Sequence, residues 1–131
     1  MGKTRFDWVG PGFVVAQQYQ VEAPLGEGGY GAVYVATQLS LGRRVALKLL
    51  HPEVLVRERA RERFEREARV TQQLAHPNIV RLFDFGATES GIPYIVCELL
   101  EGRSLEQELR ARGAFSVPRA AHVAQQMLKG L

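Results

Sequence analysis

Four glycines fall within six residues, between two runs in which apolar and polar side chains alternate. The cluster is GEGGYG, Gly26 to Gly31, and the alternation predicts strands over residues 19–25 and 32–37 on either side of it. Glycine lacks a Cβ, so a ligand can approach such a loop closely, and its exposed N–H groups can bind phosphate oxygens. The same spacing is also typical of a plain flexible turn, so the choice between a phosphate-binding loop and a turn depends on the neighbouring residues.

A dinucleotide-binding fold is the first alternative for this spacing. In that fold the glycine loop joins a strand to a helix, and an acidic residue follows about 20 positions later. Here a strand is expected directly after Gly31, and the stretch about 20 residues beyond Gly26 is ALKLL, which has no acid. The sequence therefore favours a strand–loop–strand hairpin over a dinucleotide site.

Lys48 is one of only three lysines, and it lies in the apolar strand-like run VALKLL, residues 45–50. A lysine in such a strand either reaches solvent from an edge or faces a cavity, and in the second case it needs an anionic partner. Glu67 is the expected partner, because at 100° per residue it points along the apolar stripe of the following helix. That stripe comprises Ala60, Phe64, Val70, Thr71 and Leu74. The alternative is a surface pair of Glu67 with Arg63 alone.

The order of the periodic segments predicts an α+β chain with an antiparallel sheet. Strands are expected over residues 19–25, 32–37, 44–50, 79–86 and 92–100. A long helix is expected over 54–75, a second after a capping box from Ser104 to Gln107, and a third from Ser116 to the end, with Pro118 in its first turn. Residues 1–18 show little periodicity and are predicted to form an irregular N-terminal extension.

Composition narrows the class of protein further. The net charge is +3, but the densest basic run, Arg57 to Arg69, alternates Arg with Glu, which is typical of a solvated helix and not of a nucleic-acid surface. The single Cys97 excludes an internal disulfide, and no apolar run is long enough for a signal peptide or a membrane span. We therefore expect a cytoplasmic protein with no nucleic-acid partner and no membrane segment.

With these motifs in order, the sequence resembles the protein kinase superfamily, in particular bacterial serine/threonine kinases of the eukaryotic-like type. The glycine-rich loop of the family matches Gly26 to Val33, and its V-A-I-K strand matches Val45 to Lys48. RFEREARV matches the helix that carries the ion-pair glutamate, here Glu67, while HPNIVRLFDFG and YIVCELLEGRSL are similar to the later strands and hinge. The resemblance extends from Tyr19 to Leu131.

The resemblance implies a kinase small lobe over residues 19–100, with a five-stranded antiparallel sheet and one long helix, and the first helices of a large lobe over 101–131. It implies that a Lys48–Glu67 ion pair positions the phosphates of ATP, beneath a lid formed by Gly26, Glu27, Gly28, Gly29, Tyr30 and Gly31. It also implies adenine walls at Leu25, Val33 and Ala46, a gatekeeper at Cys97, and hinge contacts from the carbonyl of Glu98 and the amide of Leu100. Ser104 falls near the ribose position, although a plain helix cap explains it equally well.

The 131 residues contain no H-R-D or A-P-E motif, and the DFG at Asp84 to Gly86 is expected to close a strand. The resemblance thus implies an N-terminal kinase portion, truncated before the catalytic loop, that transfers no phosphate alone. We expect no metal site in it. In a longer parent, ATP, Mg²⁺ and a protein substrate are implied. The alternative is a non-catalytic nucleotide-binding or protein-interaction module that uses the apolar stripe of the last helix, Val117 to Leu131.

Overall fold

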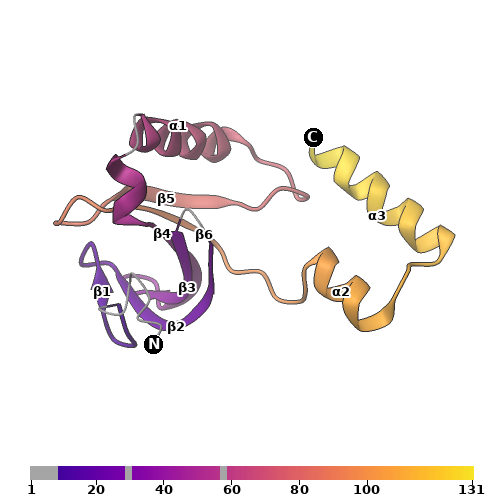
Figure 1. The fold of residues 1–131 in the computed structure, drawn as a ribbon, viewed down its shortest axis with the longest axis horizontal. Coiled ribbons are helices and arrows are strands. Elements are labelled where there is room, and N and C mark those ends of the chain that lie inside the picture. The colour runs from indigo at the N-terminus through magenta and orange to yellow at the C-terminus, as the bar shows by residue number, and fades with distance from the viewer. Residues whose placement is uncertain (1–8, 29–30, 57–58) are drawn as a thin grey trace.

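The computed structural model describes residues 9–28, 31–56 and 59–131. It forms one six-stranded antiparallel sheet in the order β1-β2-β3-β4-β6-β5, with helices outside it (Figure 1). The strands are β1 (Val14–Val15), β2 (Tyr19–Glu27), β3 (Gly31–Gln38), β4 (Arg43–Leu50), β5 (Leu82–Ala87) and β6 (Pro93–Glu98). The helices are η1 (Pro52–Val56), α1 (Ala60–Gln73), α2 (Leu105–Arg112) and α3 (Val117–Gly130). The predicted α+β class with an antiparallel sheet is confirmed.

The sheet has one strand more than predicted, because part of the expected irregular extension joins it. β1 forms a hairpin with β2, closed by a turn in which Gln18 N–H donates to Val15 O at 3.0 Å. Both central residues of this turn, Ala16 and Gln17, have positive φ, as in the hairpin turns that match strand twist. Val9 and Val15 are buried, so this segment contributes to the core.

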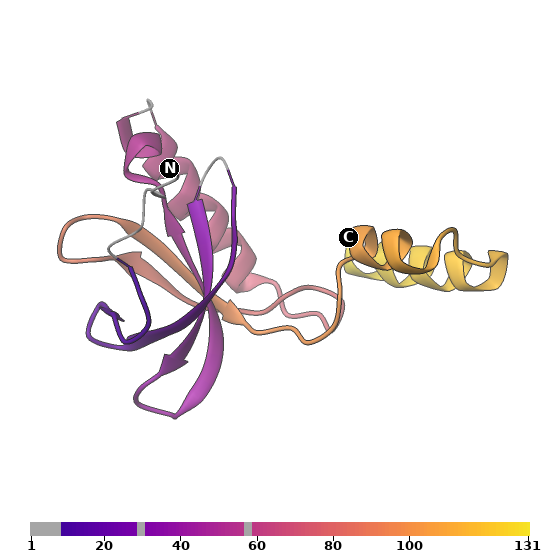
Figure 2. The ribbon, with the colours of Figure 1, turned by 60° about the horizontal axis from the view of Figure 1, so that its bottom comes forward.

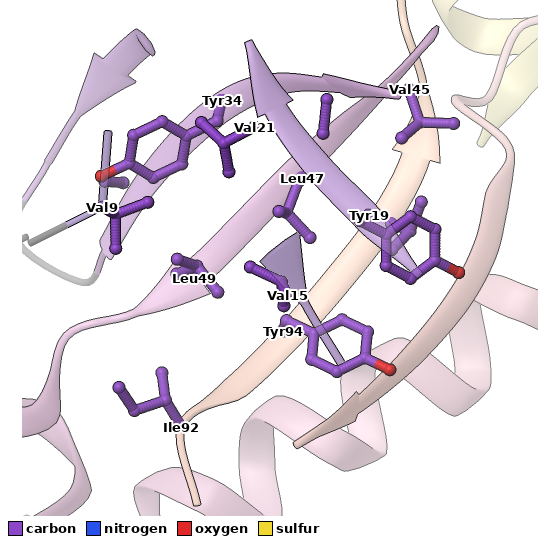
Figure 3. Close-up of a cluster of buried hydrophobic side chains, with 13 residues drawn as sticks. Val9, Val15, Tyr19, Val21, Tyr34, Val45, Leu47, Leu49, Ile92 and Tyr94 are labelled. Carbon is purple, nitrogen blue, oxygen red and sulfur yellow. The ribbon is translucent and has the colours of Figure 1, made fainter. Parts of the chain in front are cut away.

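The core lies on one face of the sheet, where alternate residues of neighbouring strands meet (Figure 3). In β4 the period of two is clear, since Val45, Leu47 and Leu49 are fully buried. The rings of Tyr19 and Tyr94 pack beside them, with centroids 5.9 Å apart and planes tilted by 60°. The opposite face of β4 is therefore left for other contacts.

The predicted long helix is present as α1, but the bounds predicted for it, residues 54–75, are wrong at its start. The structure divides this stretch into the short 3₁₀ helix η1 and the helix α1, and Arg59 between them adopts a left-handed conformation with φ of 61°. A left-handed residue interrupts the helical backbone, so α1 takes its own direction. Val54 of η1 and Ala68 of α1 are buried, and α1 packs against β5 and β6.

The two C-terminal helices begin as predicted. Ser104 and Gln107 form a reciprocal capping box, and the Ser116 hydroxyl accepts from Arg119 N–H at the start of α3. Both helices lie to one side of the sheet (Figure 2). Asn78 connects α3 to the segment before β5, because its side-chain amide donates to the carbonyl and the side-chain oxygen of Gln126 at 2.6 and 3.0 Å.

Tyr19 carries a polar contact into the core. Its hydroxyl donates to Asp84 Oδ2 at 2.7 Å, and burial, followed by this bond to Asp84, raises the pKa of Tyr19 far above its ordinary value near 10. Burial also raises the pKa of Tyr94. Below about pH 10 both tyrosines are neutral in the folded and unfolded chains, whereas above it only the unfolded chain ionises readily.

We therefore expect the free energy of unfolding to fall as the pH rises above about 10, and Tyr19→Phe to make that fall shallower. At pH 7 the same variant should be destabilised by about 1–3 kcal/mol, because Asp84 loses its donor. Urea unfolding at pH 7, 9 and 10.5 measures both effects. Equal pH slopes for the variant and the wild type would contradict the assignment.

Candidate nucleotide-binding site

The open face of the sheet brings four of the predicted site residues together. Val33 lies opposite Lys48, and Ala46 lies opposite Cys97, in the register of β3, β4 and β6. Directly opposed residues of antiparallel strands point to the same face, so these side chains share a surface. It is the reverse of the core face, because Ala46 and Lys48 alternate with the buried Val45, Leu47 and Leu49.

The glycine hairpin borders this surface. Gly28 N–H donates to Gly31 O at 2.9 Å across the turn, while Gly29 and Tyr30 lie outside the described residues. A Cβ on Gly31 would collide with the carbonyl oxygen of Leu49, whereas at Gly26 or Gly28 it would meet no atom within 4 Å. Glycine is therefore required at position 31 by packing against β4. At positions 26 and 28 open space adjoins the backbone, which suits a phosphate group.

His51 also lies in this region, and no sequence motif pointed to it. It follows β4, is fully buried, and places Nε2 2.9 Å from the carbonyl oxygen of Gly28 and 3.5 Å from Glu27 Oε1. The strand register explains its position, since Gly31 pairs with Leu50 and the residue directly after β4 therefore lies beside the hairpin.

Glu67 differs from its prediction. Its side chain is exposed and lines a surface hollow with Arg63 and Arg66, so its expected inward orientation is wrong. The helix buries Ala68, which lies about 100° around the axis from Glu67. Of the predicted stripe, Ala60, Phe64 and Thr71 are partly buried while Val70 and Leu74 are exposed, so the buried face is turned from the predicted stripe toward Ala68. Lys48 is exposed as well, and between these two described residues no ion pair of 4.0 Å or less is present. Their pairing stays a prediction.

The end of β6 is held by backbone and side-chain bonds. Glu98 N–H donates to Arg81 O at 2.9 Å, and Glu98 Oε1 accepts from Arg81 N–H at 3.0 Å. These bonds fix the segment that carries the predicted hinge contacts, while the Leu100 side chain is exposed. Ser104 Oγ accepts from Gln107 N–H, so its role as a helix cap is confirmed and a ribose contact stays a prediction.

Leu25 lies on β2 at the outer side of the hairpin. The pairing of β2 with β3 shifts register between Pro24 and Gly26, as expected for a proline at a bulge, and Leu25 is exposed there. It lines a hollow with Ala32 and Tyr34, which lie on the core face. The structure therefore does not place Leu25 with Val33, and its contact with adenine stays a prediction.

Cys97 behaves as a small apolar side chain. Burial raises the pKa of its thiol, and the nearby Lys48 ammonium lowers it by a smaller amount. The thiol is therefore protonated at neutral pH, which agrees with a packing role and not with a reactive nucleophile.

Both carboxylate oxygens of Asp84, in the DFG sequence, accept hydrogen bonds from residues of the sheet. Its Oδ2 accepts from the Tyr19 hydroxyl, and its Oδ1 accepts from Phe85 N–H at 2.9 Å. Across the described ranges, the structure gathers no three His, Cys, Asp or Glu side chains into a potential metal site. In the same ranges, no helix has the length and apolar character needed to cross a bilayer.

Comparison with known proteins identifies the family. The family described as "Protein kinase domain" matches residues 19–131 of this chain. The serine/threonine-protein kinase pkn3 of Myxococcus xanthus is 40% identical over 120 residues, covering 92% of this chain and 22% of that protein. PrkC of Bacillus subtilis, another serine/threonine-protein kinase, is 34% identical over 117 residues, covering 89% of this chain and 18% of that protein.

The fold agrees with this match. The crystal structure of the Mycobacterium tuberculosis PknI kinase domain superposes with a TM-score of 0.77 and 25% identity, covering 99% of this chain and 51% of that chain. The chain thus spans about half of that kinase domain and about a fifth of the two relatives above. On the family match over residues 19–131, the chain belongs to the protein kinase domain family, alongside bacterial serine/threonine kinases.

Proposed function

We propose that this chain is the ATP-binding portion of a serine/threonine protein kinase that acts on protein substrates in the cytoplasm. The observation that carries the proposal is the open face of β3, β4 and β6, where Val33, Ala46 and Lys48 lie together beside the glycine hairpin. An apolar patch next to a cation and open glycine backbone is the chemistry that a nucleotide requires.

Each of these residues has a distinct role in the proposal. Val33 and Ala46 provide the apolar surface for the adenine, with the Glu98 carbonyl and the Leu100 amide at its polar edge. The Lys48 ammonium binds the phosphates, and backbone N–H groups of the hairpin cover them. Glu67 is proposed to pair with Lys48 once nucleotide is bound, which requires its side chain to leave the exposed position seen here.

ATP, with Mg²⁺, supplies the phosphoryl group in the complete kinase. The 131 residues hold neither an H-R-D motif nor a D-F-G aspartate free to bind metal, since Asp84 is bonded to Tyr19 and Phe85. The chain alone is therefore expected to bind ATP without transferring phosphate. Mg²⁺-dependent incorporation of labelled phosphate by the purified chain, lost in Lys48→Ala, would contradict this expectation.

Lys48→Ala is expected to weaken ATP binding roughly 10- to 100-fold, because a charge-assisted hydrogen bond contributes about 1.5–3 kcal/mol. Isothermal titration calorimetry of the 131-residue chain with ATP measures this change. The matched control is Lys129→Ala, since Lys129 lies in the last turn of α3, far along the chain from the proposed site. If both variants bound ATP equally tightly, Lys48 would not contact the phosphates. If the wild type bound none, the proposed function would be wrong.

An interaction module is the second candidate, favoured by the exposed apolar side chains of α3 and its C-terminus. These are Val117, Met127, Leu128 and Leu131. A non-catalytic protein that uses this face would form a stable heterocomplex in which these residues are protected from hydrogen exchange. Protection of α3 without any ATP binding by the wild-type chain would favour this candidate over the first.

A further inference from the structure

His51 is the one histidine, lysine, arginine or acidic side chain that is buried among the described residues. Burying a polar ring costs free energy unless the ring is hydrogen-bonded, so the contacts of the His51 ring are needed to offset that cost. Its Nε2 lies 2.9 Å from the carbonyl oxygen of Gly28, a residue 23 positions earlier in the chain. The contact thus joins the end of β4 to the glycine hairpin.

The chemistry of this contact fixes the direction of the hydrogen bond. A carbonyl oxygen only accepts, so Nε2 must carry the proton and donate to Gly28. The carboxylate of Glu27 lies on the same side of the ring, with Oε1 3.5 Å from Nε2. Two adjacent groups of the hairpin, one carbonyl and one carboxylate, therefore face a single donor at the end of β4.

The hairpin is attached to β4 at a second point. Gly31 packs directly on the backbone of Leu49, so closely that no Cβ fits between them. Gly28 and Gly31 are themselves joined by a hydrogen bond of 2.9 Å. Both arms of the hairpin thus contact the segment from Leu49 to His51 at the end of β4, and Lys48 is the residue directly before this segment.

We propose that His51 is a positioning residue that holds the first arm of the glycine hairpin in place relative to Lys48. It touches no nucleotide itself and acts through the Gly28 carbonyl, beside Glu27. Insofar as it concerns nucleotide affinity, the inference rests on the proposed ATP site. The anchoring of the hairpin is independent of that function and is tested without nucleotide.

The first test concerns the folded chain alone. ¹⁵N NMR of the His51 ring is expected to show the Nε2–H tautomer, and His51→Leu is expected to speed amide exchange at Gly28. His51→Gln retains an N–H donor at a similar reach and should restore most of the protection. The matched control is His122→Leu, on the exposed surface of α3, which should leave Gly28 unchanged. An Nδ1–H tautomer, or unchanged Gly28 exchange in folded His51→Leu, would overturn the proposal.

The second test compares ATP with adenosine, which lacks the phosphates that the hairpin would cover. His51→Leu should weaken ATP binding roughly 3- to 10-fold, the equivalent of one net hydrogen bond, and change adenosine binding by less than about 2-fold. His51→Gln should bind ATP nearly as well as the wild type. An equal loss for both ligands would indicate general unfolding of the site and count against positioning. If the wild type bound no ATP, the proposed function would fail, while the tautomer and exchange data would still decide the anchoring.

Discussion

Gly31→Ala is expected to destabilise the folded chain by about 3 kcal/mol, because the added Cβ would collide with the carbonyl oxygen of Leu49. The obstacle is backbone and cannot rotate away, so β3 and β4 must separate locally. The collision lies where Gly31 pairs with Leu50, at the start of β3. Urea unfolding followed by circular dichroism gives the free energy of unfolding, and ATP binding by the folded variant should weaken in parallel.

The matched controls are Gly26→Ala and Gly28→Ala, where a Cβ would meet no atom within 4 Å. Both should change the free energy of unfolding by less than about 1 kcal/mol, as is usual for substitutions without a steric cause. If Gly28→Ala weakened ATP binding while stability held, the open space there would be occupied by ligand. Equal destabilisation by all three alanines would show that chain flexibility, and not the contact with Leu49, is what glycine provides.

Leu47→Ala is the second large effect, with an expected loss of about 2–5 kcal/mol. Leu47 is fully buried in the core, between Val45 and Leu49 on β4 (Figure 3), so its removal leaves a cavity on the core face of the sheet. A small domain has only about 5–15 kcal/mol of stability in total, so unfolding should begin at a much lower urea concentration.

The control for this change is Leu41→Ala, in the turn between β3 and β4, where the leucine is largely exposed. That variant should stay within about 0.5 kcal/mol of the wild type. Because Leu47 lies on the opposite face of β4 from Lys48, the folded fraction of Leu47→Ala should bind ATP with unchanged affinity. A loss below about 1 kcal/mol would mean that the core can collapse around the missing side chain.

The sequence predicted the sheet best where a period of two controls it. The alternation predicted the strands that carry Lys48 and Ala46, and the resemblance placed Val33 and Cys97 near them. The strand register then explains why these four side chains share a face. The helix caps at Ser104 and Ser116 were equally local, since each uses a residue three positions away.

The misses arose where tertiary contacts or unusual backbone decide the structure. β1 was missed because its turn uses Ala16 and Gln17 in left-handed conformations, where sequence rules expect Gly, Asn or Asp. α1 begins at Ala60 because Arg59 before it also adopts a left-handed conformation. Arg59 makes no side-chain capping hydrogen bond, so no capping motif in the sequence marks this start. The exposure of Glu67 was not predicted because the residue that α1 buries is Ala68, a small side chain outside the predicted stripe.

The pairing of β4 with β6 has a consequence for the size of molecule that the open face accepts. Val45 lies opposite Glu98, and Lys48 follows Val45 by three residues, or about 10 Å of extended strand. The rise of the β-strand therefore sets the distance between the proposed adenine edge and the proposed phosphate cation. One residue inserted between Val45 and Lys48 would lengthen that distance and would also turn the Lys48 side chain to the core face. The strand backbone thus determines how long a ligand can be between its adenine end and its phosphate end, and the side chains determine which group binds at each end.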